Sequence, residues 1–482
     1  MLESVAMTAA APLLPAELRV VRATSIGQVA DFRSQSERDQ ITAADEQWDG
    51  RKLSAEALRT IIAGATANRA IAPAGIRIRG ARISGDLNLA GLNIPFPLAL
   101  TGCVIDRPII VAHCTLHSLS LTGSQIAGLD ATSVRVSSDV LLNQQFVAQE
   151  EVSFAEAQLH GDLSCNGGKF APQRGSALRL DKAGIGGHLL LSNGFKAVGR
   201  IDLTGATIGQ RFYCAHGAVE NPGHHAITAD GTHFAGGITI TNGFKTRGEF
   251  RLDDAAITGL FYCNNCSFDN PSGYALSADR VHIAGDAIMG NWFYAKGMVR
   301  FADAEIGGNM RCIGGAFDNP GRIALLLDRM RLGHSLRLHT RFLATGAVSV
   351  DGAVIGNNLI CSAGSFQNTA GVALSACRTK INGQAVMSDG FRARGAVLFD
   401  DSELGDLICS AGVFENPDGI ALSANSAHIA GNALLNSGFH SLGKVQFDNA
   451  CIGGEIDCTD GVFEEAVQTS ITRKSFKAQL RK

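Results

Sequence analysis

The chain of 482 residues is 45% hydrophobic and 18% charged, a composition that excludes intrinsic disorder. Its formal net charge of −3 is too small to indicate a nucleic acid or an anionic membrane as partner, so we expect no nucleic-acid partner. Only two Trp and four Tyr are present, which disfavours large aromatic clefts, and no apolar run of roughly 18 residues predicts a membrane span.

The N-terminal part differs from the rest of the chain. We expect residues 1–45 to be weakly ordered; their apolar start, MLESVAMTAAAPLLPAEL, places Glu3 where a secretion signal carries positive charge, and a cleaved signal stays an open alternative. Ser54 then offers an N-cap to a helix in which Leu58, Ile61 and Ile62 share one face. We predict a helical cap over residues 46–75 that covers the open edge of the following repeat.

A repeat occupies most of the chain from about Ile76 onwards. Phe, Cys and Asn each recur at intervals of 49 residues, with a single interval of 48 in each series. Columns that share one period predict a repeat architecture. They are Phe146, Phe195, Phe244, Phe293, Phe342, Phe391 and Phe439; Cys165, Cys214, Cys263, Cys312, Cys361, Cys409 and Cys458; and Asn221, Asn270, Asn319, Asn368 and Asn416.

Each repeat of 49 residues splits into two similar halves. ADRVHIAGDAIMGNWF, from Ala278, aligns with FADAEIGGNMRCIGGAF, from Phe301, after a shift of 23 residues, so one coil has 24–25 residues. Short segments of alternating hydrophobicity, punctuated by Gly at this coil length, predict an all-β fold, a right-handed parallel β-helix over residues 76–463. The remaining residues, 464–482, form a basic tail that is a cap, a basic arm or a free end; its cations are Arg473, Lys474, Lys477, Arg481 and Lys482.

Two segments carry a family resemblance: GATIGQRFYC (Gly205 to Cys214) and DAEIGGNMRC (Asp303 to Cys312). Over about residues 50–463 the chain resembles bacterial right-handed β-helix repeat proteins with GAxIGGDLxC-like coils, which are distantly akin to pentapeptide-repeat solenoids. Its coils exceed 20 residues and lack the strict A-(D/N)-L-x-x pattern of the pentapeptide group. The resemblance implies a fold and little about activity, and no GxGxxG loop after a strand supports an oxidoreductase.

The cysteines first suggest a metal or redox site, because Cys263 and Cys266 have CxxC spacing. Cys263, however, belongs to the inward cysteine ladder, in which cysteines alternate with aliphatic residues from coil to coil and behave as small buried apolar groups. Cys266 replaces a glycine in a turn column, and we expect its thiol to react in the native state. We therefore predict no metal and no cofactor, and unpaired thiols favour a reducing, cytoplasmic location.

Charged residues also form columns. His282, Glu305 and Arg331, like Lys380, Glu403 and His428, are expected to stack as alternating charges on adjacent strands, which favours a structural ladder over acid–base catalysis. Aspartates form two further columns, which fit calcium-dependent lyase chemistry, a DNA mimic, or corner residues bonded to local backbone. The corner interpretation is preferred; the columns are Asp253, Asp254, Asp303, Asp351, Asp400, Asp401 and Asp448, and Asp181, Asp230, Asp279 and Asp328.

The aromatic residues are the one local rather than repeated feature, because all four Tyr and Trp292 lie within 82 residues. Strand alternation predicts that Tyr213 and Tyr262 point outward on one sheet, in a column that Thr239 and Ile288 continue. Exposed Tyr beside Arg is typical of interaction hot spots. The candidate binding residues are Tyr213, Tyr262, Ile288, Arg311 and Arg337.

These observations favour a non-catalytic binding or scaffold protein that engages a protein partner through one outward sheet face. The first alternative is a carbohydrate-active β-helix enzyme, a polysaccharide lyase or hydrolase, which the scarcity of Trp and Tyr disfavours. The second is a DNA-mimic inhibitor, which requires a surface much more negative than a net charge of −3 provides. The partner's identity and the oligomeric state stay open.

Overall fold

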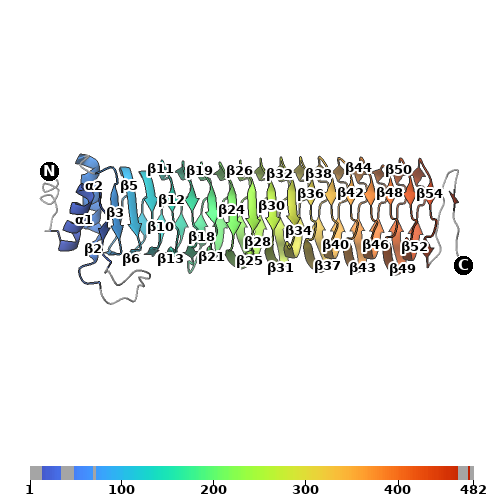
Figure 1. Ribbon diagram of the computed structural model, residues 1–482, viewed down its shortest axis with the longest axis horizontal. Helices are drawn as coiled ribbons and strands as arrows, with labels where there is room; N and C mark the ends of the chain where they lie inside the picture. Colours follow the sequence, from blue (N-terminus) through green and yellow to red (C-terminus); the bar gives the residue numbers. More distant parts are fainter. Residues whose placement is uncertain (1–12, 34–47, 69–71, 465–475, 478–482) are drawn as a thin grey trace. The chain divides into compact units, whose positions relative to one another are not determined.

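The computed structural model describes residues 13–33, 48–68, 72–464 and 476–477. These residues form a right-handed parallel β-helix of about 17 coils with two short helices, which confirms the predicted fold class. The chain divides into unit 1, Met1–Asn221 with Ala226–Gly236, and unit 2, Pro222–His225 with Gly237–Lys482. Figure 1 shows the strands within each unit lying parallel in successive coils. No helix among the described residues is long and apolar enough to cross a membrane.

Two helices, α1 (Pro15–Ser25) and α2 (Ala55–Asn68), precede the regular coils. The predicted N-cap is present, since the Ala57 N–H donates to Ser54 Oγ over 3.4 Å, and the predicted apolar face of α2 is buried. Helix α1 was not predicted. Its Glu17 is only 4% exposed and accepts hydrogen bonds from the N–H groups of Leu14 and Ser54, so it links α1 to the start of α2.

The predicted divisions of the chain at residues 45, 75 and 463 stay predictions. Residues 1–12 of the apolar start and four cations of the basic tail (Arg473, Lys474, Arg481 and Lys482) lie outside the described residues. The fifth tail cation, Lys477, belongs to a short strand that pairs in parallel with the last coil, Asp457 opposite Lys477.

Two sheets, A and B, run through the coils of each unit. In unit 1, sheet A contains β1 Ala30–Asp31, β3 Ile76–Arg79, β5 Asn93–Thr101, β8 Thr115–Ser120, β11 Arg135–Val136, β12 Val140–Leu141, β15 Gln158–Leu159, β16 Leu163–Ser164, β19 Gly184–Ile185, β20 Leu189–Leu191, β23 Thr207–Ile208, β24 Phe212–Ala215 and β26 His233–Phe234. Sheet B of unit 1 contains β2 Lys52–Ser54, β4 Arg82–Ser84, β6 Val104–Ile105, β7 Ile109–Ile110, β9 Gln125–Ile126, β10 Leu129–Asp130, β13 Val147–Ala148, β14 Val152–Ser153, β17 Lys169–Phe170, β18 Ser176–Arg179, β21 Lys196–Val198 and β22 Arg200–Asp202. Strand β25 (Ala218–Thr228) contributes residues to both units.

In unit 2, each coil gives sheet A two short strands, which form two parallel rows, and gives sheet B one longer strand. The first row of sheet A contains β29 Ala256–Ile257, β32 His282–Ile283, β35 Glu305–Ile306, β38 Arg331–Leu332, β41 Val354–Ile355, β44 Lys380–Ile381, β47 Glu403–Leu404, β50 His428–Ile429 and β53 Cys451–Ile452. The second row contains β27 Ile238–Thr241, β30 Phe261–Asn264, β33 Ala287–Gly290, β36 Met310–Arg311, β39 Leu336–Arg337, β42 Leu359–Ile360, β45 Ala385–Val386, β48 Leu407–Ile408, β51 Ala433–Leu434, β54 Ile456–Asp457 and β56 Phe476–Lys477. Sheet B contains β28 Phe244–Arg251, β31 Cys266–Ser277, β34 Tyr294–Arg300, β37 Ala316–Leu326, β40 Leu343–Ser349, β43 Ser365–Ser375, β46 Arg392–Leu398, β49 Val413–Ser423, β52 His440–Gln446 and β55 Val462–Phe463.

A column of Phe rings fills the interior of unit 2 along sheet B. Nine rings from Phe268 to Phe463 follow one another with centroids 5.0–5.5 Å apart. Phe317 pairs with an alanine on either side, because the ring stands at the turn in one coil and on the strand in the next. The coils with Phe on the strand carry a small residue at the turn, Cys266 before Phe268 and glycine in the later coils, and a Cβ on Gly315 would lie 3.2 Å from the Phe317 ring. This exchange of large and small residues produces the two-coil period.

The inward position of the second row forms the predicted cysteine ladder. Ile240 pairs with Cys263, and Cys263 pairs with Met289, so thiols and aliphatic groups alternate in successive coils. Burial raises the pKa of the Cys312 and Cys361 thiols well above their ordinary range. None of the twelve cysteines, all of which lie within the described residues, forms a disulfide, and ten of them are buried.

The expectation for Cys266 was wrong. Its side chain is 4% exposed, because the turn column points inward beneath the Phe rings, as the contact of Gly315 with Phe317 shows. The accessible thiols are instead Cys451, which is exposed, and Cys377, which is partly exposed.

We expect iodoacetamide to alkylate Cys451 first and Cys377 more slowly in the native chain, because the other ten thiols are buried. Mass spectrometry of tryptic peptides after timed labelling measures each rate, and labelling in guanidinium, where all twelve cysteines should react, is the control. Native labelling of Cys312 or Cys361 as fast as Cys451 contradicts the inward ladder.

Candidate binding surface

Four of the five candidate binding residues lie at the outward position of successive second-row strands in unit 2. Parallel register pairs Thr239 with Tyr262 and Tyr262 with Ile288. It then pairs Ile288 with Arg311 and Arg311 with Arg337. Thr239 and the four candidates that follow it are all partly exposed, on strands roughly 4.8 Å apart. The fifth candidate, the partly exposed Tyr213, belongs to unit 1.

The same column continues with aliphatic residues that the sequence analysis missed. Ile360, Val386, Ile408 and Leu434 follow Arg337 in register, and each is partly exposed. An outward position of a half-solvated sheet normally carries polar residues, so an aliphatic run here is a departure. Its signal was in the sequence, because each of these residues directly precedes a ladder position. We name the nine residues the outward strip: Thr239, Tyr262, Ile288, Arg311, Arg337, Ile360, Val386, Ile408 and Leu434.

The polar groups of the outward strip differ in how they are held. Asn264 Nδ2 donates to the Tyr262 hydroxyl over 2.6 Å, which orients that ring. Arg311 forms an ion pair of 2.9 Å with Asp286. Arg337 forms no ion pair within the described part of the chain, and its Nε is buried without a hydrogen-bond partner there. A buried guanidinium nitrogen without an acceptor is costly, so Arg337 is suited to an acceptor from a partner.

The first row of sheet A carries the predicted charge ladder, and its register is confirmed. Glu305 pairs with His282 on one side and with Arg331 on the other, and Glu403 lies between Lys380 and His428. The Glu305–His282 and Glu403–Lys380 contacts measure 3.4 and 3.2 Å and are more than half exposed. Repeated exposed pairs without a cavity give no desolvated point at which acid–base chemistry could be concentrated.

The two predicted aspartate columns are sorted differently in the structure. Asp253 accepts a hydrogen bond of 3.0 Å from the Asp279 N–H, and Asp328 accepts one of 3.1 Å from the Asp351 N–H. Residues of the two predicted columns therefore alternate along a single column of the structure. The carboxylate oxygens of Asp253 and Asp328 accept from backbone N–H groups of the neighbouring coil rather than from local backbone. The predicted bonding to local backbone is therefore wrong for these residues. Within the described residues, no three His, Cys, Asp or Glu side chains gather as metal ligands do.

The next residue of the same corner is Asp254, Asp303 or Asp401. Arg280 donates to Asp254 over 2.6 and 2.7 Å, and Arg329 donates to Asp303 over the same distances. These hydrogen bonds hold the pKa of Asp254 and of Asp303 below the ordinary range. Arginine therefore neutralises the negative charge of these aspartates along the corner. This disfavours both a calcium site and a phosphate-like surface.

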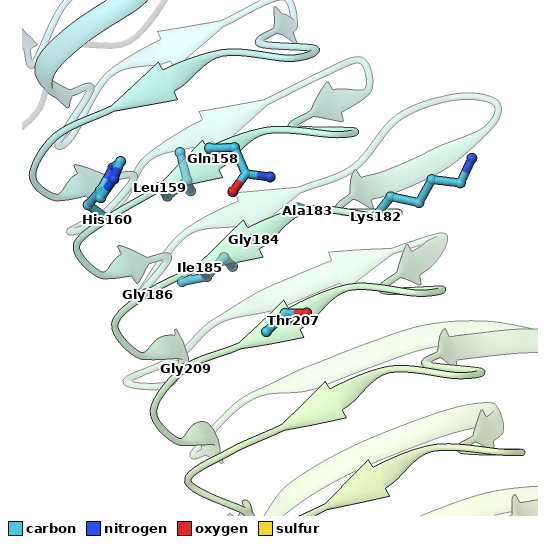
Figure 2. Close-up of a pocket in the computed structure, with 10 residues that line it drawn as sticks. All are labelled: Gln158, Leu159, His160, Lys182, Ala183, Gly184, Ile185, Gly186, Thr207 and Gly209. Atoms are coloured by element: carbon cyan, nitrogen blue, oxygen red, sulfur yellow. The ribbon is translucent and has the colours of Figure 1, made fainter.

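One open depression of about 430 Å³ lies on sheet A of unit 1, where Gly184 interrupts the outward column between Gln158 and Thr207 (Figure 2). Gln158 leans over the gap, since a Cβ on Gly184 would lie 2.6 Å from its Oε1. His160 lies at one end, where its Nδ1 is 3.1 Å from the Val136 carbonyl oxygen, and the Lys182 side chain points away. The polar groups do not converge, so the depression is a gap left by a missing side chain.

Comparisons with protein-family models, with curated proteins and with solved structures find no match to this chain.

Glu305→Ala should lower the stability of the chain by about 1 kcal/mol or less, because the Glu305–His282 pair of this exposed ladder is screened by solvent. Phe317→Ala should cost about 3–5 kcal/mol, because it opens a cavity between two stacked rings. Urea denaturation followed by circular dichroism compares the two midpoints under identical conditions. A loss for Glu305→Ala as large as for Phe317→Ala would contradict a screened surface ladder.

Proposed function

We propose that this chain is a non-catalytic binding or scaffold protein that engages a protein partner through the outward strip of unit 2. The observation that carries the proposal is the continuous column of partly exposed apolar side chains with Arg311 and Arg337 among them. Nine strands at roughly 4.8 Å give a strip on the order of 38 Å long, which can seat one edge of a protein partner and is alone smaller than a standard interface. Apolar surface beside Arg is what interface cores favour.

An enzyme of carbohydrates is the alternative function. It requires an acid and a base held together at one point, and often calcium. Many carboxylates of the described residues instead bond neighbouring coils or exposed arginines, as Asp253 and Asp254 do. A DNA mimic is a weaker alternative, because the acidic corner alternates with arginine.

Origin and location are part of the same proposal. The GAxIGGDLxC-like coils support kinship with bacterial β-helix repeat proteins, and hence a bacterial origin. Twelve cysteines without a disulfide among them support a reducing compartment such as the cytoplasm.

Paired substitutions within two coils test the outward strip. Arg337→Ala with Ile360→Asp alters the second row, and Arg331→Ala with Val354→Asp makes the same changes on the first row of the same coils. We expect the second-row variant to bind its partner at least tenfold more weakly, since it removes a guanidinium and places a charge in an apolar interface. The first-row control should bind as the unaltered chain does.

The measurement is affinity capture from cells that express the chain, followed by the dissociation constant of each captured protein. Thermal unfolding of both variants checks that the fold is kept. Equal partner binding by both variants removes the outward strip from the interface.

A further inference from the structure

Trp292 stands at a corner of unit 2 that normally carries glycine. The corner lies between the second row and sheet B, and two successive residues there have positive φ, 41° at Asn291 and 73° at Trp292. Positive φ at both residues is the type I′ arrangement, which strongly favours glycine at the second. That second position is Gln145, Gly194, Gly243, Trp292, Arg341, Gly390 and Gly438 in the successive repeats.

Nothing in the fold explains a large side chain at this corner. A Cβ placed on Gly243 or Gly438 meets no atom within 4 Å, so the corner projects into solvent. Trp292 is accordingly 77% exposed, the highest value among the exposed large apolar residues of the described chain. A bulky residue held in the left-handed region without packing in return indicates a role outside the fold.

The neighbours of Trp292 extend this exposed surface. Tyr294 is 39% exposed and Leu343 is 36% exposed, and both are outward residues of one sheet B column with only Ala316 between them. The Tyr294 hydroxyl donates to Asp318 over 3.1 Å, which fixes the ring. A fixed aromatic ring loses little conformational entropy when a partner covers it.

Arg341 stands at the same corner two coils after Trp292. The intervening coil places Gly314 there, and a Cβ on Gly314 would lie 3.6 Å from the Asn291 nitrogen and 3.9 Å from the Thr340 carbonyl oxygen. Gly314 contributes no side chain between Trp292 and Arg341, whose backbones are roughly 9.5 Å apart. We name Trp292, Tyr294, Gly314, Arg341 and Leu343 the Trp292 corner.

The charge at this corner is unbalanced in favour of cations. Arg341 is exposed and, like Arg337 on the adjacent row, forms no ion pair within the described part of the chain. Two carboxylates, Asp318 and Asp269, lie near Tyr294. Asp318 accepts its hydroxyl, and both lie opposite Lys296 in register. An apolar surface flanked by unpaired guanidinium groups is complementary to an acidic segment that carries an aromatic or aliphatic side chain.

We propose that the Trp292 corner anchors an acidic segment of a protein partner, whose apolar side chain packs on Trp292 while its carboxylates bind Arg341 and Arg337. That the ligand is a protein rests on the proposed function. Leu343 supports it independently, since an aliphatic wall favours an apolar side chain over a sugar, which requires polar hydrogen-bonding groups around the ring. An acidic oligosaccharide shares the remaining chemistry and is therefore an arm of the test.

Short peptides test the chemistry directly. The probe is the acetylated, amidated pentapeptide Glu-Glu-Phe-Glu-Glu, compared with Lys-Lys-Phe-Lys-Lys and Glu-Glu-Ser-Glu-Glu. Saturation-transfer NMR on the full-length chain should show millimolar binding of the first peptide and at least fivefold weaker binding of the other two, because each lacks one half of the recognition. Fluorescence gives a second readout, since Trp48 is only 3% exposed and the solvent-sensitive emission comes from Trp292.

Substitutions that restore the glycine of the sibling corners keep the fold. Trp292→Gly should weaken binding of Glu-Glu-Phe-Glu-Glu at least fivefold and Arg341→Gly at least threefold, whereas Gln145→Gly, at the matching corner of unit 1, should have no effect. Equal binding by Trp292→Gly, or no binding by the unaltered chain, overturns the proposal. Tighter, Trp292-dependent binding of trigalacturonate overturns the protein assignment.

The outcome is separable from that of the proposed function. If captured proteins require Arg337 and Ile360 but not Trp292, the outward strip stands as the interface and the Trp292 corner is excluded as its anchor. If Trp292→Gly abolishes peptide binding while the second-row variant captures every partner normally, the corner stands with Arg341 alone as its cation, and the outward strip and the role of Arg337 do not.

Discussion

Parallel stacking in register is the constraint on which the structure depends. Each residue lies above its counterpart in the neighbouring coil, so a large side chain must find space that the next coil leaves free. In unit 2 this space is made by moving Phe between the turn and the strand, with Gly315 beneath Phe317 and Ala295 beside it. The same demand explains the alternation of Cys312 with longer aliphatic residues. The cysteines are needed for their size, and their chemistry is suppressed by burial.

Stacking also determines where the carboxylates can act. Corners between strands leave backbone N–H groups that lack a ladder partner, and buried groups of this kind must be satisfied. Asp253 and Asp328 accept such groups from the next coil, as Asp286 does at the start of the second row, where it accepts the Asn309 N–H over 2.7 Å. A carboxylate committed to two coils is a poor general base. The abundance of Asp along the repeat is therefore accounted for by backbone satisfaction and does not require a reaction.

Periodicity made the fold predictable because it reports register directly. The 49-residue period, the inward ladder and the alternating ladder of His282, Glu305 and Arg331 all follow from counting. Burial at turns does not follow, since it depends on which way a corner points; Cys266 was assigned to solvent and lies beneath a ring. The sequence equally did not show which backbone N–H donates to an Asp carboxylate at a corner, because N–H groups of the local backbone and of the neighbouring coil are both within reach. Strand alternation identified the candidate residues on the outward strip. Ile360, Val386, Ile408 and Leu434 were missed because exposed Tyr beside Arg was taken as the mark of a binding surface.

In a repeat of this kind, departures from the pattern are informative only when the fold does not compensate for them. At Gly184 a side chain is lost, and Gln158 leans into the vacant space, so the departure is absorbed locally. At Cys266 a thiol replaces glycine and is buried, which recovers apolar contact. Trp292 recovers nothing: its φ is unfavourable, its ring is exposed, and the glycines at Gly243 and Gly438 show that the turn forms without it. A residue retained against both backbone preference and hydration is best explained by a contact that the isolated chain does not contain. Since Arg341 departs from glycine at the same corner and on the other side of Gly314, the two departures point to one ligand rather than two.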